Sequence, residues 1–253
     1  MNTKQAWRIV HVATLVFIVT LVTNWRCSSS SQLTALHPTD TLITNADING
    51  TNILVHATRG KYHNHPLMAI WVSDTNNIYI ETIYVAESIA KGQYGYGDKT
   101  SGVWEPGTLR RPAALPVWAH ARGVQEDDGL YIPTSETAMP DAVTGATPSN
   151  NFIILSNSSA KSIVHVYFEI NQTWDWNEYW TNNKYPDDED YKTSCQPSLI
   201  YRATIDIENK LVIDNFKTIG HGHYNGSTGQ IFTDLSTITT AKEILSDLTI
   251  SFK

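Results

Sequence analysis

The chain has 253 residues, of which 41% are hydrophobic, 10% aromatic and 17% charged, which is enough apolar sequence for one sizeable core or two small ones. This composition excludes an intrinsically disordered, collagen-like or multi-pass membrane protein. The formal charge is −7, and beyond residue 26 the chain carries 15 basic and 25 acidic residues, a net charge of −10. Nucleic-acid binding needs clustered Lys and Arg, so the sequence predicts no nucleic-acid partner.

The N-terminal segment predicts an export signal. Lys4 and Arg8 precede the apolar residues 9–22, which is the order of regions in a secretory signal. The apolar stretch is short for a membrane span, which needs about 20 residues. Trp7 and Trp25 flank it, so an uncleaved, tilted anchor is the alternative. In both cases we expect an exported protein of the periplasm or outer cell envelope that is tethered to a membrane.

The two cysteines have different expected roles. Cys27 follows the apolar stretch and precedes four serines, which resembles a bacterial lipoprotein lipidation site. Arg26 stands where such sites have a small residue, so lipidation of Cys27 and an uncleaved anchor are both retained as alternatives. Cys195 is expected to be a buried small hydrophobe, and a Cys27–Cys195 disulfide is the other possibility for an oxidising compartment.

The body of the chain predicts one all-β domain. Short apolar or alternating runs are separated by turn residues, as in an immunoglobulin-like antiparallel β-sandwich with long loops, and a partly open barrel is the alternative. The expected strands are Ile53–Ala57, Leu67–Ser73, Ile78–Val85, Phe152–Leu155, Ile163–Ile170, Ser198–Ile207, Lys210–Ile213 and Leu248–Phe252. Helical periodicity is expected only in Thr239–Asp247 and Ala86–Lys91.

Three segments are expected in chain order. Residues 1–26 are the signal peptide or membrane anchor, residues 27–45 are a Ser/Thr-rich flexible tether, and residues 46–253 are a single β-sandwich domain. Two stretches, Gly92–Pro140 and Asn171–Gln196, are too long for ordinary sandwich loops. Long ordered loops on a rigid scaffold often carry function, so candidate sites are sought there and beside them.

One short string points to flavin chemistry. Asp141-Ala142-Val143-Thr144-Gly145-Ala146-Thr147 resembles the Asp-x-x-(Ser/Thr)-Gly-Ala-Thr motif at which a flavin transferase attaches FMN through a phosphoester bond to the final threonine. The resemblance implies covalent FMN, and the residues implied are Asp141, Thr144, Gly145, Ala146 and the acceptor Thr147. Pro148 departs from the motif, because flavin carriers have an apolar residue there. The alternative is a plain loop with turns at Asp141 and Thr144.

Six strings taken together carry a second resemblance. They are Pro66–Asp74, Ile80–Ala86, Leu115–Arg122, Asp141–Pro148, Asn171–Asp175 and Gln196–Tyr201. In this order they resemble a Bacteroidetes-type member of the domain-of-unknown-function 2271 family of predicted periplasmic proteins, over roughly residues 50–253. The resemblance implies an envelope location, an immunoglobulin-like sandwich, and association with flavin transferases and PepSY-type membrane proteins. It supplies no demonstrated activity and no catalytic residues.

A second candidate site is the stretch from Trp174 to Tyr191, where aromatic and acidic residues interleave as in modules that stack on sugars. Its candidate ligand-binding residues are Trp174, Trp176, Trp180 and Tyr185. The alternative is a loop folded over one end of the sandwich, with its aromatic rings in the core and its charges in water.

No catalytic centre is visible in the sequence, since the nucleophile-elbow, zincin, P-loop and dinucleotide-binding motifs are absent. The pairs His63/His65 and His221/His223 match no zinc signature, so no metal site is predicted. We therefore expect a non-enzymatic accessory or electron carrier of an extracytosolic flavin-linked redox system, in which Trp118 or Tyr131 stacks on the flavin ring. An envelope module that binds a glycan or protein, and a purely structural interaction domain, are the alternatives.

Overall fold

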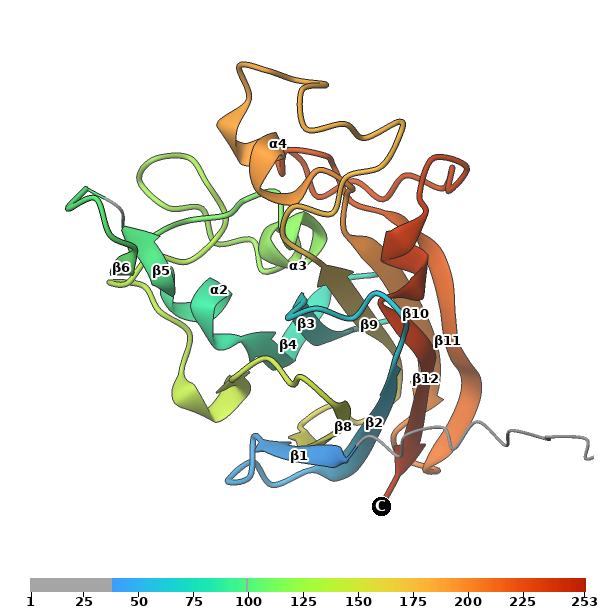
Figure 1. The fold of residues 1–253 in the computed structure, drawn as a ribbon. Coiled ribbons are helices and arrows are strands. Elements are labelled where there is room, and N and C mark those ends of the chain that lie inside the picture. Colours follow the sequence, from blue (N-terminus) through green and yellow to red (C-terminus); the bar gives the residue numbers. More distant parts are fainter. Residues whose placement is uncertain (1–37, 99) are drawn as a thin grey trace, which may run out of the picture. The chain divides into compact units, whose positions relative to one another are not determined.

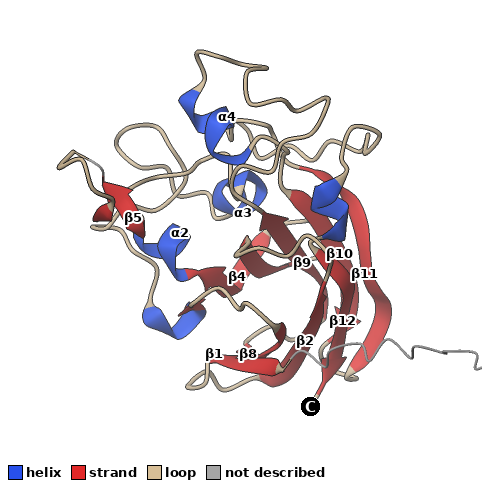
Figure 2. Ribbon diagram, viewed as in Figure 1, coloured by secondary structure: helices blue, strands red, loops and turns tan. Residues whose placement is uncertain are grey.

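The structure is a computed structural model, and it describes residues 38–98 and 100–253. Over these residues the fold is the all-β sandwich that the sequence predicts, with two main sheets and only short helices (Figures 1 and 2). The expected signal or anchor, residues 1–26, and the candidate lipidation residue Cys27 lie outside the described residues. Among the helices of the described ranges, none is long and apolar enough to cross a membrane.

The first sheet has four strands in the order β1-β8-β2-β12. They are β1 (Thr39–Thr44), β8 (Asn151–Ser158), β2 (Thr51–Arg59) and β12 (Leu245–Phe252). β1 runs parallel to β8, whereas β2 is antiparallel to both of its neighbours. The expectation of a flexible tether as far as residue 45 is therefore wrong for Thr39–Thr44. This β-branched-rich segment pairs with the free edge of β8, and Leu42 packs against the core.

The second sheet has six strands in the order β11-β10-β9-β3-β4-β7. They are β11 (Leu211–His221), β10 (Leu199–Asp206), β9 (Ile163–Asn171), β3 (Leu67–Ser73), β4 (Tyr79–Ala86) and β7 (Thr144–Gly145). The turn between β3 and β4 is held by Asp74, whose Oδ1 accepts hydrogen bonds of 2.8 Å from the backbone N–H groups of Asn76 and Ile78. The short strand β7 pairs in parallel with the end of β4, so the sandwich is not purely antiparallel.

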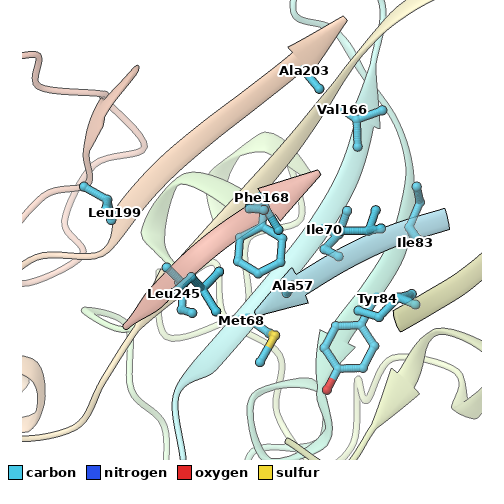
Figure 3. Close-up of a cluster of buried hydrophobic side chains, with 14 of the residues drawn as sticks. Ala57, Met68, Ile70, Ile83, Tyr84, Val166, Phe168, Leu199, Ala203 and Leu245 are labelled. Carbon is cyan, nitrogen blue, oxygen red and sulfur yellow. The ribbon is translucent and has the colours of Figure 1, made fainter. Parts of the chain in front are cut away.

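The main core fills the space between the two sheets. Alternate residues of each strand point inward, because neighbouring side chains of a strand leave opposite faces. Figure 3 shows Ala57 and Leu245 of the four-stranded sheet beside Met68, Ile70 and Phe168 of the six-stranded sheet. All five side chains are buried.

A second apolar cluster covers the outer face of the six-stranded sheet, so every residue of β3 is buried. The stretch from residue 92 to 140 supplies much of this cover through α3 (Pro116–Ala121), helped by α2 (Glu87–Lys91). The same stretch also forms a two-stranded hairpin, β5 (Gln93–Asp98) and β6 (Glu105–Thr108). Part of the segment Gly92–Pro140, which is too long for an ordinary sandwich loop, therefore packs on the outer face of this sheet.

The predicted helix over Thr239–Asp247 is wrong. A single 3-10 turn, Thr240–Glu243, precedes β12, whose residues Leu248 and Ile250 face the core while Leu245 pairs with Arg59 of β2. The apolar spacing of this segment suits a helix locally, but the ladder with β2 satisfies its backbone groups instead. The short helix expected over Ala86–Lys91 is confirmed as α2.

Candidate flavin-attachment site

The flavin-motif string lies at the edge of the six-stranded sheet. Asp141–Val143 forms a 3-10 turn, and Thr144 and Gly145 then pair with Val85 and Ala86 at the end of β4. Val143 is buried beneath this turn, which anchors the string to the second apolar cluster. The last two residues, Ala146 and Thr147, leave the sheet edge toward the surface, so the proposed acceptor follows a fixed strand directly.

Gly145 has a packing role of its own. A Cβ atom there would lie 2.9 Å from Leu42 Cδ2 and 3.0 Å from Tyr84 Cε2, which is closer than an alanine tolerates without movement. The hydroxyl of Tyr84 donates to the carbonyl oxygens of Gly145 and Ala146, at 3.1 and 3.2 Å. Burial raises the pKa of Tyr84, so the phenol keeps the proton that it donates. The glycine therefore lets the string approach β4 whether or not a phosphate is bound.

The other motif residues make local turn contacts. The Asp141 carboxylate lies 3.0 Å from Lys91 Nζ, which also pairs with Glu87 at 2.8 Å. The Thr144 hydroxyl donates to the Asp141 carbonyl oxygen over 3.4 Å. These contacts match the plain-turn alternative for Asp141 and Thr144, so both residues are explained by structure alone.

The end of the string, Ala146 and Thr147, lines a cavity. The cavity has a volume of about 510 Å³, within the roughly 300–1,000 Å³ of small-molecule sites. It lies between α2, the β5–β6 hairpin and the end of the string, and its polar lining groups are those of Glu87, Ser88, Lys91, Gln93, Thr108 and Thr147. Among the described residues, the half-buried Thr147 hydroxyl has no hydrogen-bond partner, so it is free to be modified.

Tyr94 of β5 is the aromatic side chain that lines this cavity. The guanidinium of Arg111 stacks over its ring, 4.6 Å from the centroid, and donates a hydrogen bond of 2.5 Å to Thr173 Oγ1. Burial raises the pKa of Tyr94 to about 12, so the phenol is neutral at physiological pH. The sequence did not predict Tyr94 as a site residue, because no local pattern links it to Thr147.

The two aromatic residues expected to stack on a flavin lie elsewhere. Trp118 is completely buried on the inner face of α3, and its indole N–H donates to Thr82 Oγ1 over 3.0 Å. Tyr131 stacks on His120 at a centroid distance of 4.1 Å. Neither residue lines the cavity at Thr147, so their positions do not match the expectation that one of them stacks on a flavin attached there.

The aromatic and acidic loop divides into buried and exposed residues. Trp174 and Trp176 are each 59% exposed, and Tyr179, another aromatic residue of this loop, is 52% exposed. Trp180 is only 7% exposed and belongs to the main core, and Tyr185 stacks on Tyr224 at 4.2 Å. Trp180 is therefore corrected from a ligand-binding residue to a core residue, since its large ring fills the end of the sandwich.

The histidine pairs hold no metal-like arrangement. No group of three or more His, Cys, Asp and Glu side chains within residues 38–98 and 100–253 could hold a metal ion. His63 is buried, with Nε2 at 3.0 Å from the Pro148 carbonyl oxygen and Nδ1 at 3.3 Å from that of Ile244. His65 contacts Asn64 instead. His63 therefore holds the backbone of Pro148, the residue that follows Thr147.

Cys195 is a fully buried free thiol, as expected for a small hydrophobe. Burial, together with the nearby Asp175 charge, raises the pKa of its thiol to about 11, so it is not a reactive thiolate. The buried, unreactive position of Cys195 gives it a packing role in the end of the sandwich beneath the aromatic and acidic loop.

Comparisons of the chain with family models, with curated proteins and with solved structures find no match. The site is therefore interpreted from its own geometry. The Thr147 hydroxyl and the Tyr94 ring in its lining are compatible with a phosphate ester joined to a planar ring. Lys91 is paired with Glu87 and Asp141, so it would have to exchange these carboxylates for the phosphate. The hydroxyl and the ring thus fit the group that the motif implies, whereas the carboxylate of Glu87 in the lining does not favour a phosphate.

Proposed function

We propose that the protein is a non-enzymatic accessory or electron carrier of an extracytosolic flavin-linked redox system, with FMN attached covalently to Thr147. The observation that supports this best is the position of Thr147, whose hydroxyl is free of partners in the described structure and borders a cavity of about 510 Å³. The other motif residues have turn and packing roles, so they hold Thr147 in place.

Five of the cavity residues have a proposed role toward the flavin. Thr147 carries the phosphoester, Tyr94 offers a ring face, and Gln93 and Ser88 offer polar groups to the ring edge. Lys91 would exchange its pairing with Glu87 and Asp141 for the phosphate. Bound FMN would accept and release electrons reversibly. Arg111 fixes the Tyr94 ring from outside the cavity lining.

The setting of this function is also a proposal. The N-terminal sequence supports export and attachment to a membrane, through a lipid on Cys27 or through an uncleaved anchor. The string resemblances support membership of the domain-of-unknown-function 2271 family. They also support two partners, a flavin transferase that modifies Thr147 and PepSY-type membrane proteins that supply electrons.

The proposal is tested by co-expressing the exported chain with a flavin transferase and measuring the intact mass. We expect the wild type to gain the mass of one FMN less one water, because the Thr147 oxygen forms a bond to the phosphorus of an activated flavin donor. The bond from that phosphorus to the nucleotide part of the donor breaks, and the nucleotide leaves with the proton of the threonine hydroxyl. Thr147→Val removes the hydroxyl at nearly constant shape, so it is expected to abolish the gain completely.

Thr108→Val is the matched control, because Thr108 lines the same cavity but lies outside the motif string. It is expected to retain full flavin attachment. Wild-type protein that gains no mass while a control substrate is modified in the same cells would contradict the proposal, and so would attachment that survives in Thr147→Val.

A second candidate function rests on a different observation, the exposed rings of Trp174, Trp176 and Tyr179 within six positions of the chain. Exposed aromatic rings beside acidic residues are typical of glycan-binding surfaces. If this surface is an envelope binding module, Trp174→Ala and Trp176→Ala should each weaken binding on a glycan array at least tenfold. Tyr62→Phe, a conservative change at an exposed ring outside this loop, should leave binding unchanged. The absence of binding by the wild type would remove this candidate.

A further inference from the structure

A second cavity, of about 480 Å³, lies on the outer face of the six-stranded sheet and shares no lining residue with the cavity at Thr147. Its floor is a row of three side chains on neighbouring strands. Tyr167 of β9 pairs in register with Trp71 of β3 on one side and with Arg202 of β10 on the other. The rings of Trp71 and Tyr167 are stacked, with centroids 5.0 Å apart and planes within 8°.

The remaining walls come from α3 and from the chain around the end of β11. Val117 and Ala121 of α3 face Ile219 and Ile231 across the cavity, so these walls are apolar. Gly229 passes so close to α3 that a Cβ atom there would lie 2.4 Å from His120 Cβ. The cavity is therefore framed by packed secondary structure and by a loop whose path requires a glycine.

The charge of this cavity is positive, in contrast to the chain as a whole. Arg202 is its only lining residue with a permanent charge, and no Asp or Glu lines it, although the chain has 25 acidic residues against 18 basic ones. None of the ion pairs among the described residues includes Arg202. The cavity thus combines an aromatic floor and apolar walls with a guanidinium that has no carboxylate paired to it.

His120 adds a ring nitrogen to the polar lining, which also includes Ser73 and Asn77. Its Nδ1 lies 2.8 Å from the Pro116 carbonyl oxygen, which only accepts hydrogen bonds, so Nδ1 carries a hydrogen atom. In the neutral ring Nε2 is then an acceptor. Tyr131 stacks on the ring and holds its plane.

We propose that this cavity binds a small organic carboxylate with a planar apolar body. The carboxylate would pair with Arg202, because a guanidinium matches the two oxygens of a carboxylate with parallel hydrogen bonds. The body would lie against the apolar walls, above the Trp71–Tyr167 pair, whose rings are almost completely buried at the bottom of the cavity. This binding is independent of flavin attachment, since it uses none of the residues around Thr147.

The test is a titration of the full chain with 3-phenylpropionate and with its neutral counterpart 3-phenylpropanamide, followed by calorimetry and by ligand-observed NMR. The two probes share size and ring and differ in charge. We expect saturable binding of the carboxylate and at least tenfold weaker binding of the amide. Arg202→Gln should weaken carboxylate binding at least tenfold and bring the two probes to similar affinity.

Two variants keep the test decisive. Lys217→Gln removes an exposed positive charge on the neighbouring strand β11, outside the cavity lining, and should leave binding within twofold of the wild type. Ala121→Leu fills the cavity from α3 and should abolish binding of both probes. The proposal is overturned if the carboxylate does not bind, if it binds no better than the amide, or if folded Arg202→Gln or Ala121→Leu binds it as the wild type does.

Discussion

Replacement of Glu169 with glutamine is expected to remove a pH dependence that makes the wild-type protein less stable at pH 8 than at pH 4.5. Glu169 lies on β9 and is completely buried. Its carboxylate accepts hydrogen bonds from the backbone N–H groups of Val117 and Trp118, at 3.2 and 2.7 Å, and from the Ser198 hydroxyl at 2.6 Å. It therefore caps the first turn of α3 from a neighbouring sheet.

The pH dependence follows from the pKa of this group. Burial raises the pKa of Glu169 from its ordinary value of 4.5 to about 7, against the opposing effect of its three hydrogen bonds. Between these pH values the folded protein holds a proton that the unfolded chain has released. Its free energy of unfolding therefore falls as pH rises through this range, by about 3 kcal/mol in all.

Glu169→Gln keeps the shape, and its amide oxygen can accept from the Trp118 N–H while its amide nitrogen donates to Ser198. That nitrogen also faces the Val117 N–H, so the variant loses one hydrogen bond, which costs about 1–3 kcal/mol at every pH. Its stability should lack the fall of about 3 kcal/mol that the wild type shows between pH 4.5 and pH 8. The measurement is urea unfolding of both proteins at intervals from pH 4.5 to 8. Other titrating groups, such as the buried His63, whose pKa is lowered by burial, are present in both proteins. Their contributions to the pH dependence therefore cancel when the two proteins are compared. Parallel curves for the two proteins would contradict the assignment.

Trp180→Ala is expected to destabilise the protein by about 3–5 kcal/mol, the usual cost of removing a buried aromatic ring. Trp180 belongs to the main core, its indole N–H donates to Thr237 Oγ1 over 3.1 Å, and its ring lies against Tyr191 and Tyr224. The loss of the ring leaves a cavity at the end of the sandwich where the loop around α4 (Glu189–Ser194) is seated (Figure 1).

Trp176→Ala is the matched control for Trp180→Ala, because both tryptophans lie in one loop and only one is buried. With 59% of its surface exposed, Trp176 should contribute less than about 0.5 kcal/mol to stability. Denaturant unfolding of the two variants checks this difference. Equal effects of the two substitutions would contradict the division of the loop into a buried part and an exposed part.

Local patterns predicted the parts of the fold that long apolar runs define. The run Leu67–Ser73 is β3 over the same residues, because a strand buried on both faces needs a continuous apolar sequence. β1 and β12 were harder to predict from the sequence, because each forms only by pairing with a strand far along the chain. Thr39–Thr44 reads as a polar linker until it pairs with β8, and Leu245 fits a helix until it pairs with β2.

The candidate site also has one part that the sequence predicts and one part that it does not. The string that ends at Thr147 is contiguous, so its motif is visible in the sequence. Tyr94 reaches the same cavity from more than fifty positions away, and no local pattern announces that contact. The burial of Trp180 and the exposure of Trp176 also depend on tertiary contacts, because the two residues share one polar, aromatic context.

The central claim is that Thr147 carries covalent FMN. Its most direct test is tandem mass spectrometry of the protein purified from membranes of its native cells, with proteolytic peptides searched for a flavin adduct. The account predicts one FMN on the peptide that contains Asp141–Thr147, with fragment ions that place it on Thr147. An unmodified Thr147 peptide at full abundance, in cells that make an active flavin transferase, would contradict it.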